Sequence, residues 1–181
     1  MLAAAAAHAQ DPASSADHPP GNVNELTLAG LRPGRSTIPM AEAKLGRRWR
    51  HPSGDEKDLY VWCDRRSHLK LQLETKPGGT IQVVTVERMP ASAGDAAACD
   101  AALPAALART GRGVALGDDS RRLEHTYGTP FFTGPSNWRG ENVHLIVYNF
   151  SWAGADKPQI LESSFDSAGR LVKMTLSAEY Y

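Results

Sequence analysis

Aromatic side chains in two strand-like runs are the residues of this chain best suited to recognition chemistry. In the first run, 59–63, Tyr60 and Trp62 alternate with aliphatic residues. In the second run, 143–152, the face opposite the aliphatic residues carries His144, Tyr148, Phe150 and Trp152. Large aromatic residues with a polar atom are typical of protein-binding hot spots. The alternation therefore predicts an aromatic sheet face that binds another protein. Burial of these rings under a neighbouring segment is the alternative.

A basic cluster at 47–51 adds Trp49 and Arg50 to the candidate binding residues, and Arg65 and Arg66 follow the first aromatic run. Clustered cations favour contact with an acidic partner or with lipid head groups. Cations are also favourable at the C-terminal end of a helix, so a solvated rim explains the same charges.

The chain has two cysteines, Cys63 and Cys99. Cys63 ends the first aromatic run on its aliphatic face, and Cys99 lies in an alanine-rich segment with leucines at helical spacing. If that segment packs on the aliphatic face, the two sulfurs meet in a disulfide, which suits an exported protein. Two buried free thiols are the alternative. A zinc site is not expected, because zinc needs about four ligands.

No motif of a common catalytic site is present in the sequence. It lacks the Gly-x-Ser-x-Gly elbow, the His-Glu-x-x-His zinc motif and a phosphate-binding glycine loop. Ser36 fits a helix cap better than a nucleophile, and His125 is expected on a helix surface. The sequence therefore predicts a protein that is not an enzyme and that uses no cofactor or metal.

Composition and the N-terminus indicate the compartment. The 20 basic and 20 acidic residues give a net charge of zero, which argues against nucleic-acid binding through clustered positive charge. Residues 1–10 form an alanine-rich run that ends in a small-x-small pattern typical of a signal-peptidase site. We expect a truncated signal peptide and a periplasmic or secreted protein; a disordered tail is the alternative. No other stretch approaches the roughly 18 apolar residues of a transmembrane helix.

The elements that must position these residues occur as two similar sets. Each set has a short helix that ends near a glycine, followed by strand-like runs, the last of which begins after a glycine-containing turn. The expected fold class is α+β, with two tandem units that each pack a short helix on a three- to four-stranded antiparallel meander. The expected segments are a signal remnant and leader at 1–24, a first unit at 25–90, a connector helix at 91–113 and a second unit at 114–181.

The second set contains Leu116-Gly117, Tyr127-Gly128-Thr129-Pro130 and the run 165–172, Phe-Asp-Ser-Ala-Gly-Arg-Leu-Val. The first set contains Gly34-Arg35-Ser36-Thr37 and Leu45-Gly46. Together these residues resemble the SmpA/OmlA-type lipoprotein domain of the barrel-assembly machinery and the similarly folded β-lactamase inhibitor proteins. The resemblance implies an exported binding domain without enzymatic activity. Two departures are that Arg48 stands where a proline is expected and that no cysteine precedes Cys63, so no lipid anchor is expected.

Together these features predict a protein-binding module of the bacterial envelope, acting as an enzyme inhibitor or as an envelope-assembly accessory. Aromatic anchors would supply binding, and the polar loops 51–57 and 134–142 would set specificity for another envelope or secreted protein. Two alternatives stay open. One is a small enzyme or ligand-binding protein with a site in the cleft between the units, and the other is a mainly structural module.

Overall fold

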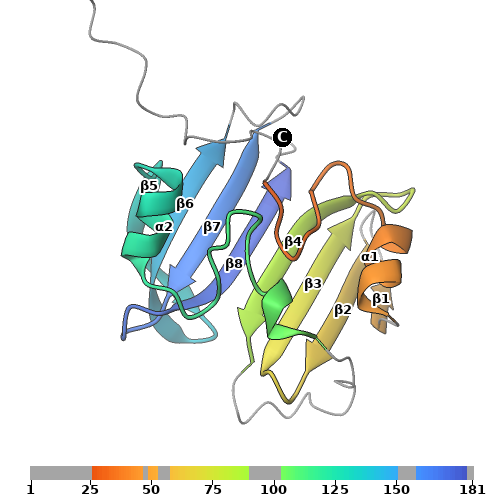
Figure 1. The fold of residues 1–181 in the computed structure, drawn as a ribbon, viewed down its shortest axis with the longest axis horizontal. Coiled ribbons are helices and arrows are strands. Elements are labelled where there is room, and N and C mark those ends of the chain that lie inside the picture. Colours follow the sequence, from red (N-terminus) through yellow and green to blue (C-terminus); the bar gives the residue numbers. More distant parts are fainter. Residues whose placement is uncertain (1–25, 47–48, 53–57, 90–102, 151–157, 179–181) are drawn as a thin grey trace, which may run out of the picture.

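The described residues form one continuous antiparallel sheet of eight strands, in the order β1-β2-β3-β4-β8-β7-β6-β5 (Figure 1). The structure is a computed structural model and describes residues 26–46, 49–52, 58–89, 103–150 and 158–178, with the backbone alone at 49–52. The strands are β1 Trp49–Pro52, β2 Asp58–Asp64, β3 Leu69–Thr75, β4 Ile81–Arg88, β5 Phe132–Trp138, β6 Glu141–Phe150, β7 Gln159–Phe165 and β8 Leu171–Ala178.

The predicted fold class, two tandem helix-on-meander units joined by a connector helix, is wrong. Strand β4 pairs with β8 from Val83 opposite Ser177 to Glu87 opposite Lys173, so the strands of both halves belong to one sheet. Strand β4 is rich in β-branched residues, which suit a central position in a sheet, and β8 contributes Val172 and Thr175. The Thr85 and Thr175 hydroxyls lie 3.2 Å apart across this pairing. Hydrophobic alternation predicts strands, but it does not predict which strand edges join.

The connector is also not helical where the structure describes it. Residues 103–113 contain only the 3-10 turn Ala105–Leu107. Pro104 precedes this turn with extended backbone angles, and its ring does not allow a helix to run through. The rest of the predicted connector helix, 91–102, lies outside the described residues.

In the described part of the chain, two short helices, α1 Ile38–Leu45 and α2 Ser120–Tyr127, lie on the same face of the sheet (Figure 1). The carboxylate of Asp119 caps α2 by accepting a hydrogen bond from the Arg122 N–H at 3.0 Å. Each helix ends at a glycine with positive φ, Gly46 at 77° and Gly128 at 81°. Among the described residues, no helix has the length and apolar character needed to cross a membrane.

The core lies between the helices and the sheet. Leu123 of α2 and Ala41 of α1 are fully buried, as are Leu73, Val84 and Met174 in the strands below them. The alternation of β3 explains this arrangement, because its leucines lie beneath the helix layer and its polar residues face the other way. Hydrophobic burial therefore joins both helices to one shared sheet surface.

The predicted polar loop at 134–142 is instead part of a β-hairpin. Strand β5 pairs with β6 from Phe132 opposite Val147 to Trp138 opposite Glu141. Gly134 and Pro135 lower the strand propensity of this segment, but an edge strand tolerates both residues. Of the other predicted loop, 51–57, the first two residues belong to β1 and the rest lie outside the described residues.

Candidate functional site

Four residues of the predicted aromatic binding face are buried, so the prediction that they form an exposed surface is wrong. The exposed fractions are 6% for Tyr60, 1% for Trp62, 2% for Tyr148 and 3% for Phe150. The register supplies the reason: Trp62 lies opposite Leu71, and Tyr60 opposite Leu73. Side chains paired across a sheet point to the same side, so these aromatic residues share the leucine face under the helices.

Two of the buried aromatic side chains form equivalent hydrogen bonds in the two halves. The Trp62 indole N–H donates to the carbonyl of Gly46 at 3.2 Å. The Tyr148 hydroxyl donates to the carbonyl of Gly128 at 3.0 Å. Carbonyls at the end of a helix have no partner within the helix, so these two donors connect each helix end to the sheet. The polar atoms of these aromatic residues are thus used inside the molecule.

Around Tyr148 the aromatic packing continues. Its ring stacks on Phe150 with centroids 5.8 Å apart, and Tyr127 of α2 lies 5.6 Å from Tyr148 and 5.5 Å from Phe150. Burial raises the pKa of the Tyr148 phenol, and the nearby Glu124 carboxylate and Tyr127 add to this increase. The ring cluster therefore belongs to the core and keeps its phenol protonated as a donor.

The other predicted site residues do not gather at one place. His144 is exposed on β6, and its Nε2 lies 3.0 Å from the Thr133 hydroxyl of β5. Trp49 and Arg50 belong to β1, where only the backbone is described. Trp152 lies outside the described residues.

The disulfide between Cys63 and Cys99 stays a prediction. Cys63 is 7% exposed in β2, and Cys99 lies outside the described residues. The chain after Cys99 does return to this strand end, because the Leu103 N–H donates to the Asp64 carboxylate at 3.1 Å. Asp64 follows Cys63 directly, so Leu103 lies beside the end of β2 that carries Cys63.

The apolar surface that sequence reasoning missed lies where the chain enters β5. Phe131 is 76% exposed and Phe132 is 48% exposed. Strand β5 is an edge of the sheet, and its seven residues, Phe132–Trp138, carry no charge. The signal was present as two adjacent phenylalanines after Thr129-Pro130, directly beyond the helix. These residues form the candidate site, which we call the Phe131–Phe132 patch.

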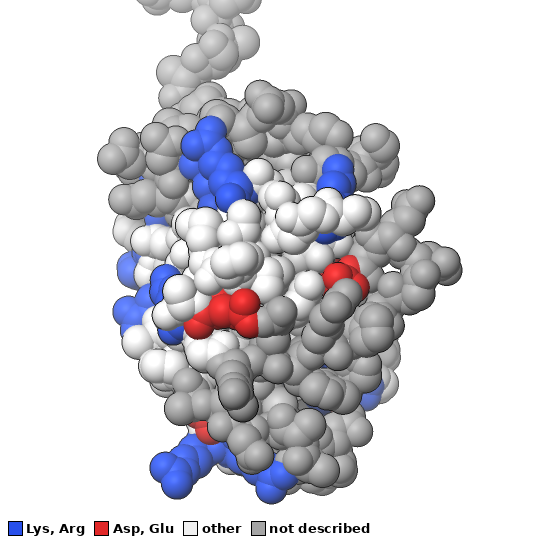
Figure 2. All heavy atoms as spheres, turned by 90° about the vertical axis from the view of Figure 1, so that its right-hand side faces the viewer, with Lys and Arg blue, Asp and Glu red and all other residues white. Residues whose placement is uncertain are grey.

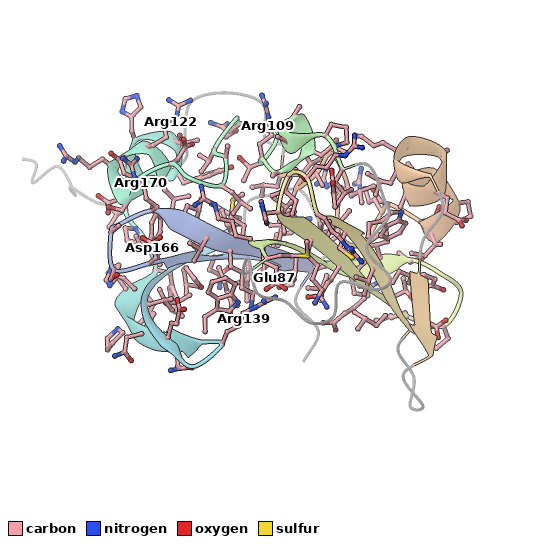
Figure 3. The ribbon with its side chains drawn as sticks, turned by 90° about the horizontal axis from the view of Figure 1, so that it is seen from below. Glu87, Arg109, Arg122, Arg139, Asp166 and Arg170 are labelled. Carbon is pink, nitrogen blue, oxygen red and sulfur yellow. The ribbon has the colours of Figure 1, made fainter. Side chains whose placement is uncertain are left out.

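On the face of the sheet away from the helices, a buried carboxylate holds the tip of the β5–β6 hairpin. Glu87 of β4 is 5% exposed and accepts from the Arg139 guanidinium at 2.8 Å and from the Trp138 indole N–H at 3.2 Å. The Lys70 ammonium lies 3.5 Å from the same carboxylate. Figure 3 shows Glu87 and Arg139 together on this side of the sheet. Because two of its three donors come from the tip of the hairpin, the carboxylate connects the hairpin to β4.

The described residues contain no group of three His, Cys, Asp or Glu side chains that could hold a metal ion. The side view in Figure 2 looks onto the β1 side of the molecule and shows basic side chains at its lower end, where the β2–β3 turn lies in Figure 1.

Comparison with known proteins gives one distant likeness. No protein-family model and no curated protein sequence matches the chain. The crystal structure of a DUF4309 family protein (YjgB) from Bacillus subtilis aligns with a TM-score of 0.48 at 16% identity, over 86% of this chain and 88% of that one. The resemblance to SmpA/OmlA-type domains and β-lactamase inhibitor proteins stays an expectation from the sequence.

Proposed function

We propose that this protein is an exported, non-enzymatic protein-binding module of the bacterial envelope, and that it recognises its partner through the Phe131–Phe132 patch. The observation that carries the proposal is the exposure of two adjacent phenylalanines at a sheet edge. Large apolar side chains that stay exposed next to one another mark interaction sites more often than single exposed residues do. The signal-like N-terminus supports the export part of the proposal.

The neighbourhood of the patch favours side-chain recognition over strand addition. Pro135 has no N–H to donate, and a proline in an edge strand blocks pairing with another chain. Phe131 and Phe132 precede this proline, and the polar side chains of Thr133 and His144 lie on the opposite face of the hairpin from Phe132. Exposed aromatic side chains are typical anchors of protein-binding hot spots.

The test compares capture of envelope proteins by the wild-type chain and by a variant with Phe131→Ser and Phe132→Ser. We expect the variant to lose the captured partner, because truncating an aromatic anchor at the centre of an interface costs at least about 2 kcal/mol. Met40→Ser is the matched control, because Met40 is 56% exposed on α1 and lies outside the patch. Circular dichroism establishes that both variants are folded. Equal capture by the wild type and the double variant would remove the patch from the proposal.

A further inference from the structure

Exposed arginines gather at the end of the sheet that carries the β2–β3 and β7–β8 turns. Hydrogen bonds place the parts of this end together: the Met89 N–H donates to the carbonyl of His68 at 2.8 Å, and the Gly117 N–H donates to that of Leu171 at 2.8 Å. Figure 3 looks onto this end and shows Arg122 and Arg170 at one side of it. The residues of this arginine end, all exposed, are Arg65, Arg66, Arg88, Arg121, Arg122 and Arg170.

Four aspartates at the same end bond to backbone N–H groups, and one of them, Asp118, accepts from the Ala115 N–H at 2.9 Å. Asp64 accepts from the Arg66 N–H at 2.8 Å, and Asp166 accepts from the Arg170 N–H at 2.9 Å. Asp119 caps α2. In the part of the chain described here, no salt bridge involves an arginine of the arginine end. The aspartate carboxylates therefore stabilise the turns through backbone hydrogen bonds and do not neutralise the arginines in salt bridges.

Within this end, Arg88 and Arg170 converge on one residue. The Arg170 Nη1 donates to the carbonyl of Gly117 at 3.3 Å. The Arg88 Nη2 lies 2.9 Å from the position that a Cβ on residue 117 would occupy, and Gly117 has a φ of 97°. Glycine thus lets both arginines approach the same loop. Two guanidinium groups beside each other repel, and an anion bound by both relieves that repulsion.

We propose that Arg88 and Arg170 bind a carboxylate on an acidic protein partner, and that the other arginines of this end extend the contact. The inference rests on the proposed protein-binding function but concerns a different surface from the Phe131–Phe132 patch. A guanidinium group pairs with a carboxylate through two parallel hydrogen bonds, which favours arginine at protein interfaces.

The mixture of positive and negative charges at this end distinguishes an acidic protein from a lipid membrane as the partner. Asp119 and Glu141 are exposed among the arginines, so a uniformly negative lipid surface would be repelled at these positions. A protein surface can instead place its carboxylates opposite the arginines and avoid the acids. The pattern therefore fits an acidic protein better than a membrane.

The test uses the full chain and measures arginine Nε–Hε signals by NMR while an oligoglutamate peptide is added, with an oligoglutamine peptide as the neutral control. We expect saturable shifts at Arg88 and Arg170 with oligoglutamate alone. Arg88→Gln and Arg170→Gln should each weaken binding about threefold and together about tenfold. Arg35→Gln is the matched control, because Arg35 is exposed beside the opposite end of β4 and should leave the affinity unchanged.

Two results would overturn the proposal. One is that oligoglutamate causes no shift of the arginine Nε–Hε signals, or causes a shift at Arg35 as large as at Arg88 and Arg170. The other is binding to vesicles containing phosphatidylglycerol that the double arginine variant loses, which would assign the surface to lipid. The variant with serine at 131 and 132 should bind oligoglutamate like the wild type, so failure of the patch proposal and failure of the arginine proposal are distinguished.

Discussion

At the scale of single residues, the aromatic side chains hold the helices in place on the sheet. Trp62 and Tyr148 each donate to the carbonyl of the glycine that ends a helix. Their rings also fill the space under that helix, so a single side chain supplies packing and a hydrogen bond. An aromatic ring with one polar atom can donate a hydrogen bond to the carbonyl at a helix end without bringing water into the core.

Tyr148→Phe tests this role through its pH dependence. The variant should lose about 1 kcal/mol at neutral pH with the hydrogen bond to Gly128. Because burial raises the pKa of the folded-state phenol, the unfolded chain ionises first as pH rises above about 10, and the wild type loses stability there. The variant has no phenol at this position and should lose less stability than the wild type as the pH rises. Urea unfolding between neutral and alkaline pH measures both effects.

Trp62→Phe is the matched control for the alkaline effect. It removes the equivalent hydrogen bond to Gly46 but leaves Tyr148 in place. We expect a larger cost in stability at neutral pH, because the smaller ring leaves a cavity at a side chain that is 1% exposed, and the full alkaline loss of the wild type. An alkaline loss as large in Tyr148→Phe as in Trp62→Phe would show that the phenol of Tyr148 is not its source.

At the scale of elements, the β5–β6 hairpin combines a demanding turn with a long-range contact. Arg139 has a φ of 54° and Gly140 one of 82°, and two left-handed residues in succession define the tight hairpin turn that favours asparagine before glycine. Arginine occupies the first position here and reaches the buried Glu87. The contact with Glu87 therefore outweighs the local preference of the turn.

Arg139→Asn separates these two effects. Asparagine suits the turn, but the substitution removes the closest cation from a carboxylate that is 5% exposed. We expect a net loss of about 1–2 kcal/mol and faster hydrogen exchange in the hairpin. Adding Glu87→Gln should cost less in the Arg139→Asn background than in the wild type, because the two residues interact. Stability of Arg139→Asn equal to the wild type would mean that the contact does not hold the hairpin.

The sequence predicts where the strands lie better than it predicts which face of each strand packs against the helices. The alternation of Leu69, Leu71 and Leu73 with polar residues identifies β3 and its buried face. Strand β2 has apolar residues on both faces, so its own pattern does not show which side meets the helices. The register across the β2–β3 turn decides this, and that turn includes His68 at a φ of 52°. A shift by one residue would reverse the facing of every side chain in β2.

The candidate sites were harder to predict for related reasons. Gly134 and Pro135 make the segment look like a loop in the sequence, but it is an edge strand, and an edge strand tolerates residues that a central strand does not. Glu87 and Arg139 are far apart in the sequence, and they meet only because the hairpin tip comes to the far face of β4. Likewise, Arg88 and Arg170 become neighbours through the pairing of β4 with β8, which hydrophobic patterns do not predict.

At the scale of the whole molecule, the β4–β8 pairing makes the two halves share one sheet. Central strands are buried under the helix layer, with Val84 and Leu176 directly opposite and both almost fully buried. Hydrophobic contacts in this layer link residues from both halves in one core. A core shared in this way should unfold as one cooperative unit.

Met174→Ala tests this cooperativity at the shared strand. Met174 is fully buried on β8, opposite Val86 of β4, and its truncation should cost about 2–5 kcal/mol through lost burial and a cavity. Because the sheet is continuous, the loss should appear equally in the half that contains Trp62 and in the half that contains Trp138. Fluorine NMR of fluorotryptophan at these two positions during urea unfolding reports on each half. The two midpoints should coincide in the wild type and fall together in the variant. If only the Trp138 midpoint fell, the halves would unfold independently, and the β4–β8 pairing would not couple them.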